Sequence, residues 1–258
     1  MDSIIQQLED GFAAQHLLRV DSSPGELEQA LLTVKAYVAI ENCVAVLSDL
    51  TADKSYVYCG AFGDFLGIGR QTETPLVLAS KWEDVIYGKI HPDDLLERHV
   101  LELRFFHFLG AMDPSQRLDY STACIIRALD GAGEYHHIHH RTLYLRNNSK
   151  GRLWLALCLY NFPLYAPSLV VGIQGKIINN KTGEIIAVEE YTNCSSMISC
   201  REREVLGCIR DGLASKEIAH RLHISINTVN RHRQNIFSKL GAKNAVEAVQ
   251  TATAMNLI

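Results

Sequence analysis

The sequence predicts an α+β protein in which an antiparallel sheet with helices is followed by an all-α module of four helices. Residues 120–162 hold three long runs of strand-forming residues between polar, glycine-containing turns, which is typical of an antiparallel meander. Residues 199–258 hold four segments with apolar residues at helical spacing and very short connections. Charge divides at the same place. From Met197 onward there are nine Lys and Arg and five Asp and Glu residues, a net charge of +4. The preceding residues contain 16 Lys and Arg and 24 Asp and Glu, a net charge of −8.

The N-terminal part is expected to contain helices and strands in a fixed order. Helical periodicity covers residues 3–18 and 24–38, and a longer helix is predicted to open at His91-Pro92 and run to about residue 109. Between them, residues 60–80 are rich in glycine and predict short helical pieces around residues 62–66. The expected strands are residues 43–48, 55–59, 120–129, 135–146 and 152–162, followed by a last hairpin of residues 169–178 and 184–188.

The C-terminal helices have clear start signals. The first begins at Ser199, which forms a capping box with Glu202, because each side chain can bond the other residue's backbone amide. The second is expected from residue 215. The fourth is capped at residue 244 and carries, as expected core positions, Val246, Val249 and Ala252.

The third helix of this module, residues 226–240, has two contrasting faces. Ser225 is a good N-cap and Gly241 is a stop signal. One stripe is apolar and predicts core positions, namely Val229, Ile236 and Leu240. The opposite stripe consists of hydrogen-bonding side chains, namely Asn227, Asn230, Arg231, Gln234 and Ser238. Two helices joined by a tight turn, the second exposed and polar, form the helix-turn-helix pattern that reads base edges in a major groove.

The run REREVL…SKEIAHRLHIS…TVNRHRQNIFSKLGA resembles the LuxR-type (GerE-like) helix-turn-helix of bacterial transcription regulators, over about a quarter of the chain. The resemblance implies that the third helix reads double-stranded DNA and that the fourth often pairs two protomers. Carried over by position, the implied base contacts are Asn230, Arg231 and Gln234. The implied phosphate contacts are Lys216, Ser225, Asn227, Thr228 and Lys239. Asn230 stands where the family usually has Lys, so we expect a sequence preference with more amide readout.

Two strands, short helices, one longer helix and three long antiparallel strands form the element order of a PAS domain. Residues 90–94 read IHPDD and residues 127–135 contain R…DG…Y, and both resemble PAS family patterns. The resemblance covers about residues 25–162 and implies a domain that encloses a ligand or cofactor, or that dimerises. We therefore predict a PAS-like sensory domain over residues 1–190, a linker over residues 191–197 and the DNA-binding domain over residues 198–258. No cofactor is predicted, and the ligand of the pocket is left open.

Other clusters have plainer interpretations. In the run of residues 136–140, His136 and His140 share one strand face while His137 and His139 share the other, which does not make a zinc set. Pocket lining, a pH response and ordinary strand surface remain open for it, and strand surface is favoured. The acids of residues 93–94 suit helix initiation better than catalysis. The seven cysteines are scattered with no C-x-x-C pair, which indicates buried thiols.

Together these patterns predict a cytoplasmic transcription regulator, not an enzyme, which binds DNA as a homodimer and contacts RNA polymerase. No apolar run approaches the ~20 residues that span a bilayer, and no phosphate-binding loop or hydrolase motif occurs. A phosphorylatable receiver domain is rejected because the strands read as antiparallel hairpins. The alternative is a protein-interaction adaptor whose PAS-like domain binds a partner while the tail only tethers DNA.

Overall fold

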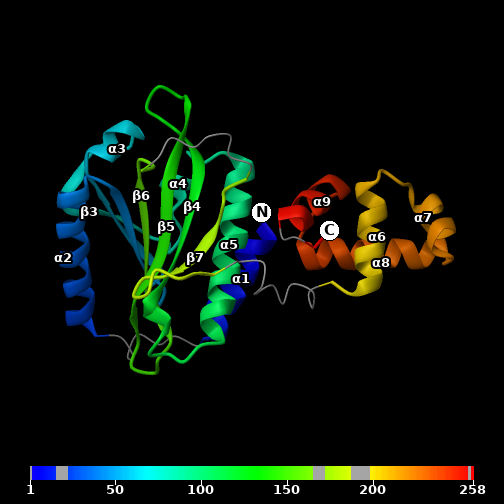
Figure 1. Ribbon diagram of the computed structural model, residues 1–258, viewed down its shortest axis with the longest axis horizontal. Coiled ribbons are helices and arrows are strands. Elements are labelled where there is room, and N and C mark those ends of the chain that lie inside the picture. The colour runs from blue at the N-terminus through cyan, green and yellow to red at the C-terminus, as the bar shows by residue number, and fades with distance from the viewer. Residues whose placement is uncertain (1, 16–22, 165–171, 187–197, 255–256) are drawn as a thin grey trace. The chain divides into compact units, whose positions relative to one another are not determined.

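The computed structural model describes residues 2–15, 23–164, 172–186, 198–254 and 257–258 (Figure 1). It divides into two compact units, one of residues 11–188 and the other of residues 1–10 with 189–258. The predicted fold class is confirmed, because the first unit is an antiparallel sheet with helices and the C-terminal region contains four helices. The predicted linker, residues 191–197, lies outside the described residues.

The sheet has eight strands in the order β3-β2-β1-β6-β5-β4-β7-β8, and all its pairings are antiparallel. The strands are β1 (Val44–Asp49), β2 (Lys54–Cys59), β3 (Gln71–Leu78), β4 (Tyr120–Leu129), β5 (Tyr135–Asn147), β6 (Leu153–Asn161), β7 (Lys176–Asn179) and β8 (Ile185–Ile186). The predicted meander of three long strands is therefore confirmed as β4, β5 and β6. Strand β1 lies between β2 and β6, so the segments before and after the long helix form one sheet.

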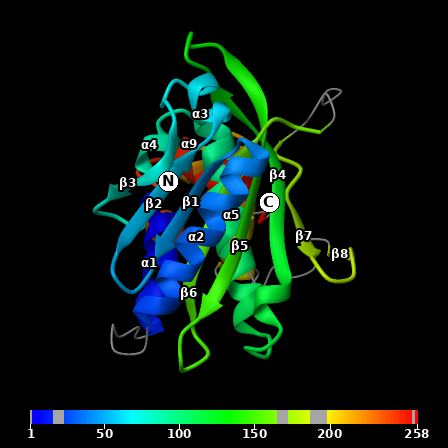
Figure 2. The ribbon, with the colours of Figure 1, turned by 90° about the vertical axis from the view of Figure 1, so that its left-hand side faces the viewer.

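Helices cover both faces of this sheet. They are α2 (Pro24–Glu41), α3 (Ala61–Phe65), α4 (Asp84–Tyr87) and α5 (Pro92–Gly110), with a 3-10 turn at Arg117–Asp119. Helix α1 (Asp2–Ala14) has residues in both compact units. Figure 1 shows α2 on one side of the sheet and α5 on the other, and Figure 2 views the sheet from the α2 side. The element order follows the one that the PAS resemblance implies, with one difference, because strand β3 lies between the short helices α3 and α4.

Two apolar cores follow from this arrangement. Val44 and Val46 of β1 point into the core under α5, and Ala45 and Leu47 point into the core under α2. All six residues of β1 are buried for this reason, since a strand covered on both faces has no solvent-facing side. The core under α2 also contains Trp154 of β6.

Two strand predictions needed correction. Residues 60–80 were expected to form only short helical pieces in a glycine-rich stretch. Helix α3 agrees with this expectation, but Gln71–Leu78 form strand β3. This strand lies at the edge of the sheet, is largely exposed and contains Pro75, so its sequence lacks the apolar alternation of a buried strand. The predicted last hairpin is shorter, with β7 and β8 spanning only Lys176–Asn179 and Ile185–Ile186. The ends of its predicted range lie outside the described residues.

The four C-terminal helices are confirmed as α6 (Cys200–Arg210), α7 (Ser215–Leu222), α8 (Ile226–Leu240) and α9 (Ala245–Ala254). The capping box of α6 is present, with the Glu202 amide donating to Ser199 Oγ at 3.2 Å and the Ser199 amide donating to Glu202 Oε2 at 2.7 Å. The prediction that Val246 belongs to the core is wrong, because it is 68% exposed. The buried stripe of α9 runs through Ala248 and Ala252, and a position two residues from Ala248 lies on the opposite side of a helix.

Candidate nucleic-acid interface

A three-residue turn joins α7 to α8. His223 closes α7 in the left-handed conformation, with φ 52° and ψ 46°, and the Ile224 amide donates to the Ala219 carbonyl at 3.0 Å. Such a conformation costs a non-glycine residue roughly 1–2 kcal/mol, which the surrounding contacts must offset. The turn ends at Ser225, the N-cap of α8, so the direction of α8 is set immediately after that of α7.

Three of the predicted phosphate contacts gather at the N-terminus of α8. Ser225 Oγ accepts a hydrogen bond from the Thr228 amide at 3.0 Å and lies 2.8 Å from Thr228 Oγ1. Ser225, Asn227 and Thr228 are all exposed. Free amides and the helix dipole at a helix N-terminus favour an anion. The hydroxyls of Ser225 and Thr228 lie at this end of α8.

The predicted base contacts form one exposed row on α8. Asn230, Arg231 and Gln234 are all exposed, and none makes a hydrogen bond or ion pair within the part of the chain that the structure describes. By contrast, the neighbouring Arg233 lies over the Phe237 ring, with its guanidinium carbon 5.6 Å from the ring centroid. The buried residues of α8 are Val229, Ile236 and Leu240, so the predicted apolar stripe is confirmed. The row is thus free to meet a ligand while the opposite stripe fixes the helix.

The two predicted lysine contacts differ in their surroundings. Lys216 is exposed near the start of α7 and has no ion pair among the described residues. Lys239 Nζ instead bonds Glu202 Oε2 at 2.7 Å, and Glu202 is buried. Burial alone would raise the pKa of the Glu202 carboxyl, but hydrogen bonds from Lys239 and Ser199 hold it below its ordinary value. Lys239 therefore has a structural partner that sequence reasoning missed.

Arg201 is a second positioning residue that the sequence analysis did not identify. Its Nη2 atom donates to the Leu222 carbonyl at 2.7 Å, and its Nη1 atom lies 2.5 Å from Glu204 Oε2. Leu222 is the last residue of α7, so Arg201 ties α6 to the helix end that precedes the turn. The one feature of the sequence that could have identified Arg201 is its position in the REREVL run.

The N-terminal unit contains a buried charged cluster between the sheet and α5. Arg98 is 1% exposed and donates from Nη1 to Tyr87 Oη at 2.9 Å and to Glu102 Oε2 at 3.0 Å. Its Nη2 atom donates to Glu83 Oε1 at 3.3 Å, and the Tyr160 hydroxyl donates to the other oxygen of Glu83. Burial, only partly offset by Arg98, raises the pKa of Glu102. Two carboxyl groups thus share a single guanidinium in the core.

Two histidines border this cluster. His99 is fully buried, and neither ring nitrogen has a well-formed hydrogen bond with any described residue. Burial, and after it the charge of Arg98, lowers the pKa of His99 well below its ordinary value. The same causes, in the same order, lower the pKa of His140, whose Nδ1 atom lies 3.5 Å from Cys124 Sγ. Both imidazoles are therefore neutral at neutral pH.

The remaining histidines of the run lie apart from the core. His136 and His137 are exposed, His139 is half-buried, and His136 Nε2 lies 2.9 Å from Asp130 Oδ2. Within the described ranges, no group of three or more His, Cys, Asp or Glu side chains is arranged to hold a metal ion. Among the described helices, none combines the length and apolar character needed to cross a bilayer. The run therefore contributes one core histidine and an open strand surface.

A short turn between two helices, with an exposed polar face on the second, defines a helix-turn-helix DNA-binding domain. Residues 196–252 match the family model of "Bacterial regulatory proteins, luxR family", which identifies a LuxR-type helix-turn-helix in this part of the chain. The HTH-type transcriptional regulator AlkS of Alcanivorax borkumensis is 32% identical over 114 residues, which are 42% of this chain and 13% of AlkS. The oxygen regulatory protein NreC of Staphylococcus aureus is 30% identical over 125 residues, which are 44% of this chain and 56% of NreC.

The chain thus spans no more than about half the length of these two relatives. Among solved structures, the Vibrio cholerae VqmA dimer without its target DNA is 15% identical to this chain, with a TM-score of 0.30. That similarity covers 86% of this chain and 88% of VqmA.

Proposed function

We propose that the chain is a sequence-specific DNA-binding transcription regulator whose helix α8 reads bases with Asn230, Arg231 and Gln234. One observation carries the proposal. These three exposed side chains, on the second helix of a luxR-family helix-turn-helix, have no intramolecular partner among the described residues. Side chains held on a rigid helix without internal partners keep their hydrogen-bonding capacity for a ligand.

The chemistry of the row suggests what it reads. Arg231 suits the O6 and N7 acceptors of guanine, and the amides of Asn230 and Gln234 suit the N6 and N7 atoms of adenine. Phosphate contacts are proposed for Lys216, Ser225, Asn227, Thr228 and Lys239. The ammonium of Lys239 has three donors, so it can bond a phosphate while keeping Glu202. With a net charge of only +4 from Met197 onward, non-specific affinity should be modest and fall steeply with salt.

We further propose that two protomers pair through α9 and that the regulator contacts RNA polymerase in the cytoplasm. The 68% exposure of Val246 supports the pairing, because it leaves an apolar side chain outside the core of its own unit. A homodimer would place two α8 helices in successive major grooves of a two-fold site. The charged cluster around Arg98 supports a sensing role for the domain of residues 1–190, because buried convergent polar groups typify ligand-responsive sites.

The test is a selection of bound sequences from random duplex DNA, using the full chain and two variants. Arg231→Ala should lose about 1–3 kcal/mol of discrimination at one base position, while the rest of the motif is retained. Arg210→Ala is the matched control, because it removes an equal charge from an exposed site on α6. It should leave the motif unchanged. If Arg231→Ala weakened binding to every DNA sequence equally, the base contact would be contradicted. If the full chain enriched no motif at all, the alternative of a protein-interaction adaptor would be favoured.

A further inference from the structure

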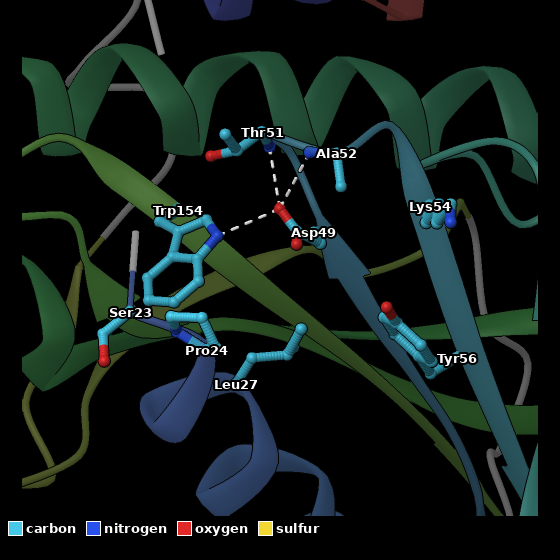
Figure 3. A pocket seen from close by; sticks show the side chains of 9 residues that line it. All are labelled: Ser23, Pro24, Leu27, Asp49, Thr51, Ala52, Lys54, Tyr56 and Trp154. Carbon is cyan, nitrogen blue, oxygen red and sulfur yellow. Dashed lines mark hydrogen bonds between the residues drawn. The ribbon is translucent and has the colours of Figure 1, made fainter. Parts of the chain in front are cut away.

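A pocket of about 280 Å³ opens on the α2 side of the sheet, away from the Arg98 cluster. It lies where the first turn of α2, the β1–β2 turn, β2 and β6 meet, and Figure 3 shows the side chains that line it. Trp154 and Leu27 provide apolar walls, and Trp154 is itself buried. Neither the helix-turn-helix nor the proposed sensing cluster accounts for this pocket.

Asp49 supplies a fixed negative charge at the pocket. The residue is 4% exposed, and its Oδ1 atom accepts three hydrogen bonds, from the Thr51 amide at 2.9 Å, the Ala52 amide at 3.0 Å and Trp154 Nε1 at 2.9 Å. Figure 3 shows the second oxygen turned away from these three donors. No described residue bonds that Oδ2 atom, so one half of the carboxylate is used by the fold and the other half is available.

Tyr56 faces the same space. Its ring is half-buried, and Figure 3 shows its hydroxyl on the side of Asp49. Within the described part of the chain this hydroxyl has no hydrogen bond. Burial, and after it the charge of Asp49, raises the pKa of Tyr56, so the phenol stays neutral.

The charge of Asp49 has no ionic partner in the described residues. Lys54 is the cation nearest along the chain that lines the pocket, yet it is exposed and forms no ion pair with Asp49. A largely buried carboxylate that is ordered by three donors but forms no ion pair, although Lys54 stands opposite it in the β1–β2 pairing, suits a cationic hydrogen-bond donor. Trp and Tyr rings beside such a donor add cation–π attraction.

We propose that this pocket binds a small organic cation, a protonated primary amine on an aromatic or apolar body. The ammonium donates to Asp49 Oδ2 and to the Tyr56 hydroxyl, and the body packs against Trp154 and Leu27. The volume is close to the lower limit of about 300 Å³ for ligand pockets, which suits a phenylalkylamine rather than a larger ligand. The site lies in the N-terminal unit, so its binding can be measured without DNA and stands independently of the proposed function.

The first experiment is isothermal titration of the full chain with three probes of equal size and different charge. Phenethylamine should bind, 2-phenylethanol should bind about tenfold more weakly or worse, and phenylacetate should not bind. Tighter binding of phenylacetate would overturn the proposal and assign the pocket to anions, held by Lys54 and the N-terminus of α2. Equal binding of all three probes, or binding of none, would also overturn it.

Four variants locate the site. Asp49→Asn keeps an oxygen for the three structural donors but removes the charge, so the protein should stay folded and lose phenethylamine affinity by about tenfold or more. Tyr56→Phe should lower the affinity for phenethylamine severalfold. Lys54→Gln should raise that affinity severalfold, because it removes a positive charge that would repel the ammonium. Leu27→Trp fills the pocket without touching Asp49 and should abolish binding. Unchanged affinity in Asp49→Asn would overturn the assignment. If Asp49→Asn proved unstable, unchanged affinity in Leu27→Trp would overturn it instead.

Discussion

Lys239 Nζ lies 2.7 Å from Glu202 Oε2, and this ion pair joins the last turn of α8 to the capping box at the start of α6. Glu202 is buried, whereas the Lys239 side chain is 43% exposed. The same lysine is a proposed phosphate contact. Its loss should therefore affect the stability of the helical region as well as DNA affinity.

Lys239→Ala should destabilise α6 and α8 by about 1–2 kcal/mol, between the values of exposed and buried ion pairs. The reason is that Glu202 would remain buried without its cation. Hydrogen exchange of the full chain should show amides of α6 and α8 exchanging about tenfold faster. Lys216→Ala is the control, since it removes a second proposed phosphate contact with no ion pair in the described residues. Equal exchange in both variants would mean that the Glu202 pair contributes no stability.

Arg98→Met should cost about 3–5 kcal/mol of unfolding free energy, because it leaves two carboxyl groups buried around an apolar side chain. Denaturant unfolding of the full chain, monitored in the N-terminal unit, measures this. Arg70→Ala should cost less than about 1 kcal/mol, since its pair with Asp64 is exposed.

A triple variant separates charge from packing in the Arg98 cluster. Arg98→Met combined with Glu83→Gln and Glu102→Gln removes the charged groups together, so it should be more stable than Arg98→Met alone. A triple variant that is less stable than the single one would show that packing, not unpaired charge, dominates.

His99→Leu should flatten the dependence of stability on pH. The folded-state pKa of His99 is far below its ordinary value of 6.5, so on acidification only the unfolded chain takes up this proton. Stability is therefore present above about pH 6.5 and is lost below it, by up to about 1.4 kcal/mol per pH unit. Denaturant unfolding at about pH 7 and about pH 5 should show a smaller difference in the variant, with His140 supplying the remainder.

The control for this experiment is His137→Leu, which replaces an exposed histidine of β5. It should leave the pH dependence unchanged. At about pH 7, His99→Leu should itself change the free energy of unfolding little, because it removes two buried nitrogens without well-formed hydrogen bonds. A variant with the original pH slope would show that His99 is protonated in the folded protein.

Val246→Glu should weaken self-association without unfolding α9, because the side chain is exposed and a charge would enter the proposed interface. Sedimentation of the full chain without DNA measures the effect. Ser238→Glu adds the same charge to α8, outside that interface, and should sediment like the unmodified protein. Equal sedimentation of all three proteins would exclude α9 as the dimer contact.

The helical domain was the part that sequence could predict best. Its signals are local, since Ser199, Ser225 and Gly241 act on residues within one turn and the apolar stripe of α8 repeats at helical spacing. The exposed row followed from the same periodicity, and the structure shows it exposed. The meander of β4, β5 and β6 was also predictable, because long strands and glycine turns alternate plainly, whereas the exposed edge strand β3 was not.

What sequence could not show depends on residues distant along the chain. Glu202 and Lys239 are 37 positions apart, and neither shows from its neighbours that it will meet the other. Glu83, Arg98 and Tyr160 come from three separate elements, so their cluster exists only after the sheet closes. Val246 was misplaced because Val246 and Val249 suggested an apolar stripe, whereas small residues, Ala248 and Ala252, form the buried one.

The Arg98 cluster constrains how related sequences can diverge. Replacing Arg98 alone leaves two buried carboxyl groups without a cation, whereas replacing Glu83 or Glu102 alone still leaves Arg98 paired with the other carboxylate. Lineages that leave the charged state should therefore lose one of the two glutamates before they lose Arg98. Homologues of this domain that lack Arg98 should consequently lack Glu83 and Glu102 as well.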